Sequence, residues 1–173
     1  MNPGMNANTD PSMRENAPRI TAPPHATVQK RVAAATALGK SDNPSAIRPL
    51  IQSLSDPHWK VRLESARALG RLGEGDAVPA LISALNDPEP AVRTAVIAAI
   101  GRVRDRRATV ALISCLKDTD DRVRIGAAGV LGKLGDPRAI EPLGALEQDP
   151  FSDVRDAAEN AVVRLMKKRS TSR

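Results

Sequence analysis

From residue 27 onward, apolar residues recur every three or four positions in short blocks that polar residues, Gly and Pro separate. Val61, Ala66 and Leu69 form one such series, and Val78, Leu81 and Leu85 form another. This spacing places the apolar side chains on one face of a helix. The blocks predict one lone helix and then four helix pairs, over 27–39, 44–72, 75–103, 106–134 and 137–168.

The same pattern returns at intervals of 31 residues. Four columns are in register: Asp56, Asp87, Asp118 and Asp149; Arg62, Arg93, Arg124 and Arg155; Leu38, Leu69, Ile100 and Leu131; and Gly39, Gly70, Gly101 and Gly132. A helix pair of this size cannot bury its apolar face alone, so neighbouring pairs stack to complete the core. The repeat therefore predicts an all-α solenoid, a right-handed α-α superhelix with about four helix pairs after a single N-terminal helix.

The segment from Asp56 to Asp76 follows the pattern DPxxxVRxxAAxALGxLGD almost throughout. This pattern resembles the short HEAT-like repeat that is also called the phycobilisome-lyase or E-Z type, and the resemblance covers about residues 27–165. It implies the fold with high specificity. It does not select a function, because such repeats occur in scaffolds, adaptors, bilin lyases and a hydroxylase.

The two ends of the chain differ in composition from the repeats. Residues 1–25 are rich in Asn, Pro and Met without periodicity, which predicts a disordered tail. The solenoid is expected over 26–168 and a basic tail over 169–173. Since no apolar run approaches about 20 residues and the N-terminus lacks a signal-peptide pattern, we expect a cytoplasmic monomer that does not contact a membrane.

The composition argues against an enzyme. One Trp, one Phe and no Tyr leave the core to small aliphatic residues, and the single Cys115 is expected to be a buried hydrophobe. Neither His25 nor His58 is followed by Glu, so the His-Glu pairs of the related di-iron hydroxylase are missing. The sequence predicts no catalytic residue, no metal site and no cofactor.

The Asp and Arg columns are interpreted as structural. A column that is present in every repeat serves the stacking of repeats and not one reaction centre. In similar repeats, the loop Asp and the helix Arg of neighbouring units bond to each other and to the loop backbone, and an Asp before a helix also caps free N–H groups. The predicted ladder is Asp56, Arg62, Asp87, Arg93, Asp118, Arg124, Asp149 and Arg155.

The outward positions of the second helix in each pair are the candidate partner-binding surface. In this type of repeat the second helices line the concave side, and the centre of that side is small and partly apolar, with a basic rim. A protein partner is expected there, as a helical or extended peptide that could be acidic. The predicted contacts are Trp59, Lys60, Leu63, Arg67, Arg71, Thr94, Ala98, Arg102, Ile125 and Lys133.

Three alternatives stay open. Trp59 could anchor a partner or shield the stack at a loop. The net charge is +6, and the basic column of Lys40, Arg71, Arg102, Lys133 and Arg164 suits either the helix dipole or a positive rail that meets phosphates. A bilin-lyase-like activity is the alternative to a scaffold, and nonspecific nucleic-acid binding is the third class.

Overall fold

The computed structural model describes residues 27–41 and 43–171, where all regular structure is helical. The predicted disordered segment 1–25 lies outside these residues. Five helices occupy the second position of a repeat: α1 Val28–Leu38, α3 Trp59–Leu72, α5 Pro90–Val103, α7 Asp121–Leu134 and α9 Ser152–Thr171. Four occupy the first position: α2 Ile47–Ser53, α4 Val78–Ala84, α6 Thr109–Cys115 and α8 Ile140–Gly144. Short 3-10 turns precede the first helices, at Pro44–Ala46, Gly75–Ala77, Arg106–Ala108 and Pro137–Ala139, and Ala145–Gln148 follows α8.

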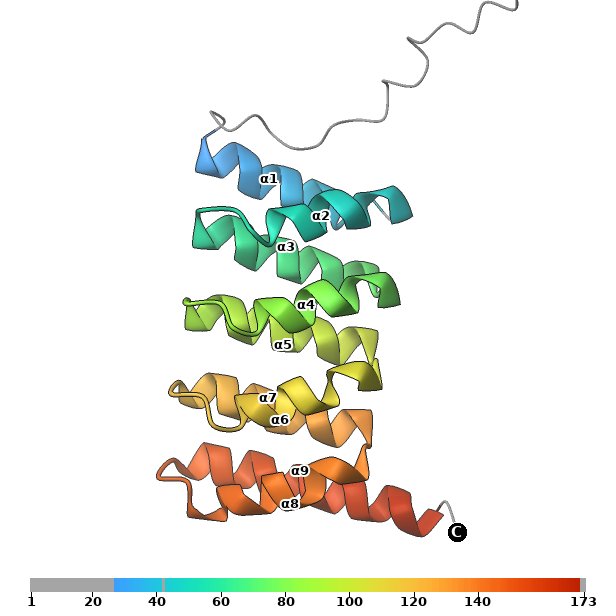
Figure 1. The fold of residues 1–173 in the computed structure, drawn as a ribbon, viewed down its shortest axis with the longest axis vertical. Coiled ribbons are helices and arrows are strands. Elements are labelled where there is room, and N and C mark those ends of the chain that lie inside the picture. The colour runs from blue at the N-terminus through green and yellow to red at the C-terminus, as the bar shows by residue number, and fades with distance from the viewer. Residues whose placement is uncertain (1–26, 42, 172–173) are drawn as a thin grey trace, which may run out of the picture.

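The helices form two layers in a single stack (Figure 1). Each second helix packs on the first helix of its own repeat and, more extensively, on the second helices before and after it. Successive first helices contact each other much less. The prediction of an all-α superhelix of stacked pairs is confirmed, with the helix boundaries close to those expected. At the C-terminus, α9 runs to Thr171 and so enters the segment expected to be a tail.

The core is built from the columns that the sequence repeats. Leu50, Leu81, Leu112 and Leu143 of the first helices are buried to 1% exposure or less. Leu69, Ile100 and Leu131 of the second helices are fully buried against them. Burial of these side chains, at about 25 cal/mol per Å² of apolar surface, is the term that holds each repeat to its neighbours.

The glycine column is where successive second helices approach most closely. A Cβ atom added to Gly70 would lie 2.7 Å from the Cα atom of Ala99, and one added to Gly132 would lie 2.9 Å from the Cα atom of Ala161. Both contacts are with backbone of the next second helix, which cannot rotate away as a side chain can. Glycine in this column therefore sets the spacing of the second-helix layer.

Both ends of the stack depart from the columns. In α1 and the turn after it, exposed Lys30 and Ser41 stand at the positions of Val61 and Leu72, which pack toward the interior of their repeat. In α9, exposed Glu159 stands where the preceding repeats have buried Ala or Ile, and exposed Val163 stands in the glycine column. The two end helices thus carry polar or bulky residues where an inner repeat would continue the stack.

Each inner second helix ends in the left-handed conformation. Gly73 and Gly135 have φ of 73° and 74°, and their N–H groups donate to the carbonyls of Leu69 and Leu131. The equivalent residue after α5 is Arg104, with φ of 60° and the same bond to Ile100. Glycine adopts this conformation without steric cost, whereas an Arg does not.

Replacing Arg104 with Gly is expected to raise the free energy of unfolding by about 1 kcal/mol, because it removes the Cβ clash of a left-handed residue. Urea denaturation followed by circular dichroism measures this change. Arg104→Lys keeps both the charge and the Cβ atom and should leave stability near that of the wild type. A loss of stability in the glycine variant would show that the Arg104 side chain contributes more than its backbone costs.

Candidate partner-binding surface

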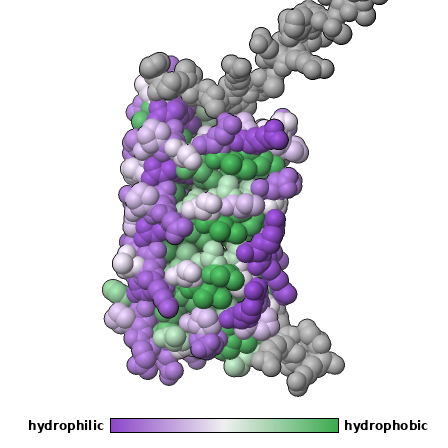
Figure 2. Space-filling model, in the orientation of Figure 1, coloured by the Kyte–Doolittle hydropathy of each residue, from purple (hydrophilic) through white to green (hydrophobic). Residues whose placement is uncertain are grey.

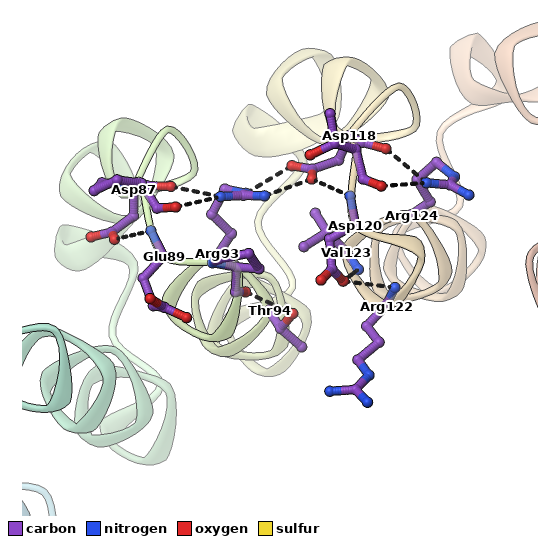
Figure 3. Close-up of polar contacts among 12 residues, drawn as sticks. Asp87, Glu89, Arg93, Thr94, Asp118, Asp120, Arg122, Val123 and Arg124 are labelled. Atoms are coloured by element: carbon purple, nitrogen blue, oxygen red, sulfur yellow. Dashed lines mark hydrogen bonds and ion pairs between the residues drawn. The ribbon is translucent and has the colours of Figure 1, made fainter.

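The Asp and Arg columns form a continuous ladder along one edge of the stack (Figure 3). Arg93 donates from Nε and Nη2 to the two carboxylate oxygens of Asp118, at 2.8 and 2.7 Å, and from Nη1 to the carbonyls of Asp87 and Pro88. Arg62 and Arg124 bind Asp87 and Asp149 in the same way. Each arginine therefore joins the loop of its own repeat to the loop of the next one.

The aspartates also shape the loops. Asp56 accepts a hydrogen bond from the N–H of His58 at 2.8 Å, and Asp87 and Asp118 accept the equivalent bonds two residues on. These bonds close the turn just before the second helix and do not reach its free N–H groups. In the described residues those groups receive other caps, such as the side chains of His58 for α3 and Asp120 for α7.

The ladder begins one residue earlier than predicted. Arg31 of α1 binds Asp56 at 2.8 and 3.0 Å, and it is 31 residues before Arg62. At the other end, Arg155 keeps the bonds from Nη1 to the carbonyls of Asp149 and Pro150. The chain has no carboxylate 25 residues after Arg155, because it ends at Arg173.

Hydrogen bonding in the ladder holds its carboxyl groups in the charged form. Burial alone would raise the pKa of Asp118, but hydrogen bonds from Arg93 and from the N–H of Asp120 outweigh burial and lower that pKa below its usual value. The hydrogen bond from Arg124 is the main cause that lowers the pKa of Asp149. These aspartates are therefore ionised partners of arginine at neutral pH.

The predicted contact residues all lie on α3, α5 and α7 with part of their surface accessible. Leu63, Thr94 and Ile125 occupy the same position on the three helices and are half-buried, so they form a shallow apolar column. Ala98 beside this column is exposed, and Gly129 follows at the equivalent position of α7. The remaining predicted contacts are exposed: Trp59, Lys60, Arg67, Arg71, Arg102 and Lys133.

Trp59 lies at the start of α3, where it is 37% exposed. Its ring stacks on His58 with centroids 6.2 Å apart, and the Nζ atom of Lys60 lies 5.6 Å from the ring centroid. A tryptophan that is held by its neighbours but open to solvent can contact a partner at low entropic cost. Its position is compatible with the anchor role that the sequence suggested.

Sequence reasoning missed the contribution of α1 to this surface. Val28 and Val32 of α1, together with His58 and Lys60, line a surface hollow of about 430 Å³. Val32 is 31 residues before Leu63, so it extends the apolar column by one repeat. The repeat spacing contained this signal, but the lone helix lacks the Asp-Pro turn that marks the other repeats.

The basic column is not a uniform rail. Arg71 donates to Glu64 at 2.7 Å, and Arg67 lies 3.8 Å from the same carboxylate. These contacts neutralise much of the positive charge on α3. Arg102 has no ion-pair partner among the described residues. Positive charge on this surface is therefore concentrated toward α5 and the turn that follows it.

The opposite layer carries a different pattern. Figure 2 shows hydrophobic residues in a stripe down the middle of the first-helix face, with hydrophilic residues along both edges. Ile51, Ile82 and Ile113 are half-buried in this layer. Cys115 of α6 is 7% exposed, and burial raises the pKa of its thiol to about 11, so it is a core residue as expected.

Two chemical tests concern the described residues only. No three His, Cys, Asp or Glu side chains lie close enough together there to hold a metal ion. None of the helices in this part of the chain is both long and apolar enough to cross a membrane.

The fold and the ladder place the chain in the class of α-helical repeat solenoids. A family model for HEAT repeats matches residues 20–95 and 78–162. The chain therefore belongs to the HEAT-repeat family. No curated protein matches it.

Solved structures agree with this assignment. The complex of CpcE and CpcF of phycocyanin lyase from Nostoc sp. PCC7120 is similar, with 27% identity and a TM-score of 0.73 over 95% of this chain and 71% of that chain. A designed armadillo repeat protein is 19% identical, with a TM-score of 0.59 over 81% of this chain and 77% of that chain. An engineered protein is 21% identical, with a TM-score of 0.58 over 83% of this chain and 76% of that chain. The last two similarities concern the fold alone.

Proposed function

We propose that this HEAT-repeat protein is a scaffold that holds a helical or extended peptide of a partner protein on its second-helix surface. The observation that carries the proposal is the apolar column of Val32, Leu63, Thr94 and Ile125, which runs across four successive second helices. Second helices also lie closer to one another than first helices do, which favours curvature toward this layer. Small residues beside the column allow the backbone of a peptide to approach.

The test begins with the full chain as bait in a lysate of its source cell, with nuclease and moderate salt in parallel. A retained protein is identified and its affinity is then measured with purified components. Loss of all retained material on nuclease treatment would favour nucleic-acid binding in place of the scaffold. A protein that is retained through both treatments provides the ligand for the next measurement.

Leu63→Asp and Ile125→Asp are each expected to weaken binding of that protein at least about tenfold, because each places a charge in an apolar contact. Val110→Asp on α6 is the matched control, since Val110 is 61% exposed in the first-helix layer. Titration by fluorescence anisotropy or calorimetry measures the affinities, and circular dichroism checks the helical content. Equal affinity of all three variants would show that the second-helix surface is not the binding site.

A lyase-related function is the second candidate, and similarity to the phycocyanin lyase complex favours it. The described surface offers few aromatic side chains to stack on a tetrapyrrole, since the chain has one Trp, one Phe and no Tyr. Mixing the protein with a linear tetrapyrrole and recording the absorption spectrum separates the two candidates. A shifted and intensified absorption band would support bilin handling, and an unchanged spectrum would leave the scaffold.

A further inference from the structure

The turn between α5 and the next 3-10 helix, residues 102–107, carries four arginines and one aspartate in the sequence RVRDRR. All four arginines are exposed. The turn lies on the hydrophilic edge opposite the ladder, the right-hand edge in Figures 1 and 2. It follows directly on the helix that carries Thr94 and Ala98, so a peptide that crosses α5 passes close to it.

Two of the arginines have structural partners. Arg107 binds Asp105 at 2.6 Å and the carbonyl of Gly75 at 2.9 Å, so it uses the one carboxylate of the turn. Arg106 donates to the carbonyls of Leu134 and Gly135, both at 3.1 Å, and so closes the end of α7. Carbonyl acceptors are neutral, and the charge of Arg106 therefore remains uncompensated.

The other two have no such partners. Among the described residues, the guanidinium groups of Arg102 and Arg104 make no hydrogen bond or ion pair. The dipole of α5 favours a base at its C-terminus, which explains Arg102 in the same way as Arg71. It does not explain Arg104, because this arginine occupies a left-handed position where Gly73 and Gly135 stand in the neighbouring turns. A side chain kept in an unfavourable backbone conformation is a signal of function.

From these observations we infer that Arg102 and Arg104 form a binding site for a carboxylate cluster in an acidic peptide segment. A guanidinium group binds a carboxylate through two parallel hydrogen bonds, and two exposed arginines with a third uncompensated charge nearby can hold two adjacent acidic side chains. This inference rests on the proposed function, because it names the acidic end of a peptide that lies on the second-helix surface.

The arrangement of charges favours a peptide over a nucleic acid. Glu74 and Asp76 lie on the preceding turn and Asp136 on the following one, so the uncompensated positive charge spans one turn. A phosphate backbone needs basic contacts along many successive phosphates. Single strands also need aromatic side chains for stacking, and Trp59 and Phe151 lie at the starts of second helices, at the other edge of the stack.

The test uses the full chain and three fluorescein-labelled probes: hexaglutamate, hexaglutamine and single-stranded DNA. Anisotropy titrations at low ionic strength are expected to show binding of hexaglutamate and not of hexaglutamine. The double variant Arg102→Glu with Arg104→Glu should weaken hexaglutamate binding at least about tenfold. Arg122→Glu, which changes an exposed arginine at the other end of α7, should change it less than about twofold.

Arg104→Gly separates binding from folding, because it should weaken hexaglutamate binding while the fold becomes more stable. Unchanged affinity in this variant, or in the double variant, would overturn the inference. So would DNA that binds more tightly than hexaglutamate and loses affinity in the double variant. Leu63→Asp should keep hexaglutamate binding. If Leu63→Asp loses the natural partner while the double variant retains it, the scaffold proposal stands and this inference fails.

Discussion

Replacing Arg93 with alanine is expected to lower the free energy of unfolding by about 3 kcal/mol, the range for breaking a buried ion pair. The substitution removes two bonds to Asp118 and two to the carbonyls of the preceding loop. The side chains of Arg93 and Asp118 are 11% and 13% exposed, so water replaces these bonds poorly. Urea denaturation measures the change.

Arg155→Ala is the matched control for this prediction. Arg155 belongs to the same column and makes the same carbonyl bonds, but it has no aspartate of a following repeat. Its replacement is expected to cost about 1 kcal/mol, the value of exposed hydrogen bonds to backbone. Equal losses in the two variants would show that the carboxylate pair adds nothing to the stacking of repeats.

The pH dependence of this difference follows from Asp118. Its pKa in the folded protein lies below the model value of 3.8, so its ionised form stabilises the fold above that value. The contribution is lost as pH falls through the lower, folded pKa. The gap between wild type and Arg93→Ala should therefore be constant near neutral pH and close in acid.

Gly70→Ala is expected to lower the free energy of unfolding by about 3 kcal/mol, although alanine is the better helix former. The added Cβ atom would lie 2.7 Å from the Cα atom and 2.9 Å from the Cβ atom of Ala99. Only a separation of α3 from α5 relieves this contact, and it exposes part of the core between them. Thermal or urea denaturation provides the measurement.

Gly129→Ala is the opposite case within the same layer. Gly129 lies inside α7, and a Cβ atom added there would meet nothing within 4 Å. Its replacement is expected to stabilise the protein by up to about 1 kcal/mol through helix propensity. If both alanine variants shift stability in the same direction, the close approach of α3 and α5 does not control the spacing of the layer.

The sequence predicted those features that every repeat shares. The 31-residue columns identified the helix pairs, the ladder and the outward positions of the second helices, because stacking requires the same residue type in each unit. Features at single positions were less accessible. The left-handed conformation of Arg104 depends on the turn after α5, and only comparison with Gly73 and Gly135 could have indicated it.

Pairing between side chains also needs the structure. Glu64 was noted as an interruption of the groove, but its contact with Arg71, seven residues on, depends on rotamers that spacing does not fix. Arg31 was overlooked because its repeat lacks a first helix and a loop aspartate. The exposed state of Trp59 likewise depends on its contacts with His58 and Lys60.

The altered ends of the stack restrict how such a chain can change its length during evolution. A duplicated unit of 31 residues inserted between α3 and α5 would meet its neighbours through contacts that already exist: arginine to the next aspartate, and glycine to the next alanine. A unit added after α9 would meet Val163 and Glu159, and one added before α1 would meet Lys30. Growth by internal gene duplication is therefore compatible with this architecture, whereas growth at either terminus requires new end residues.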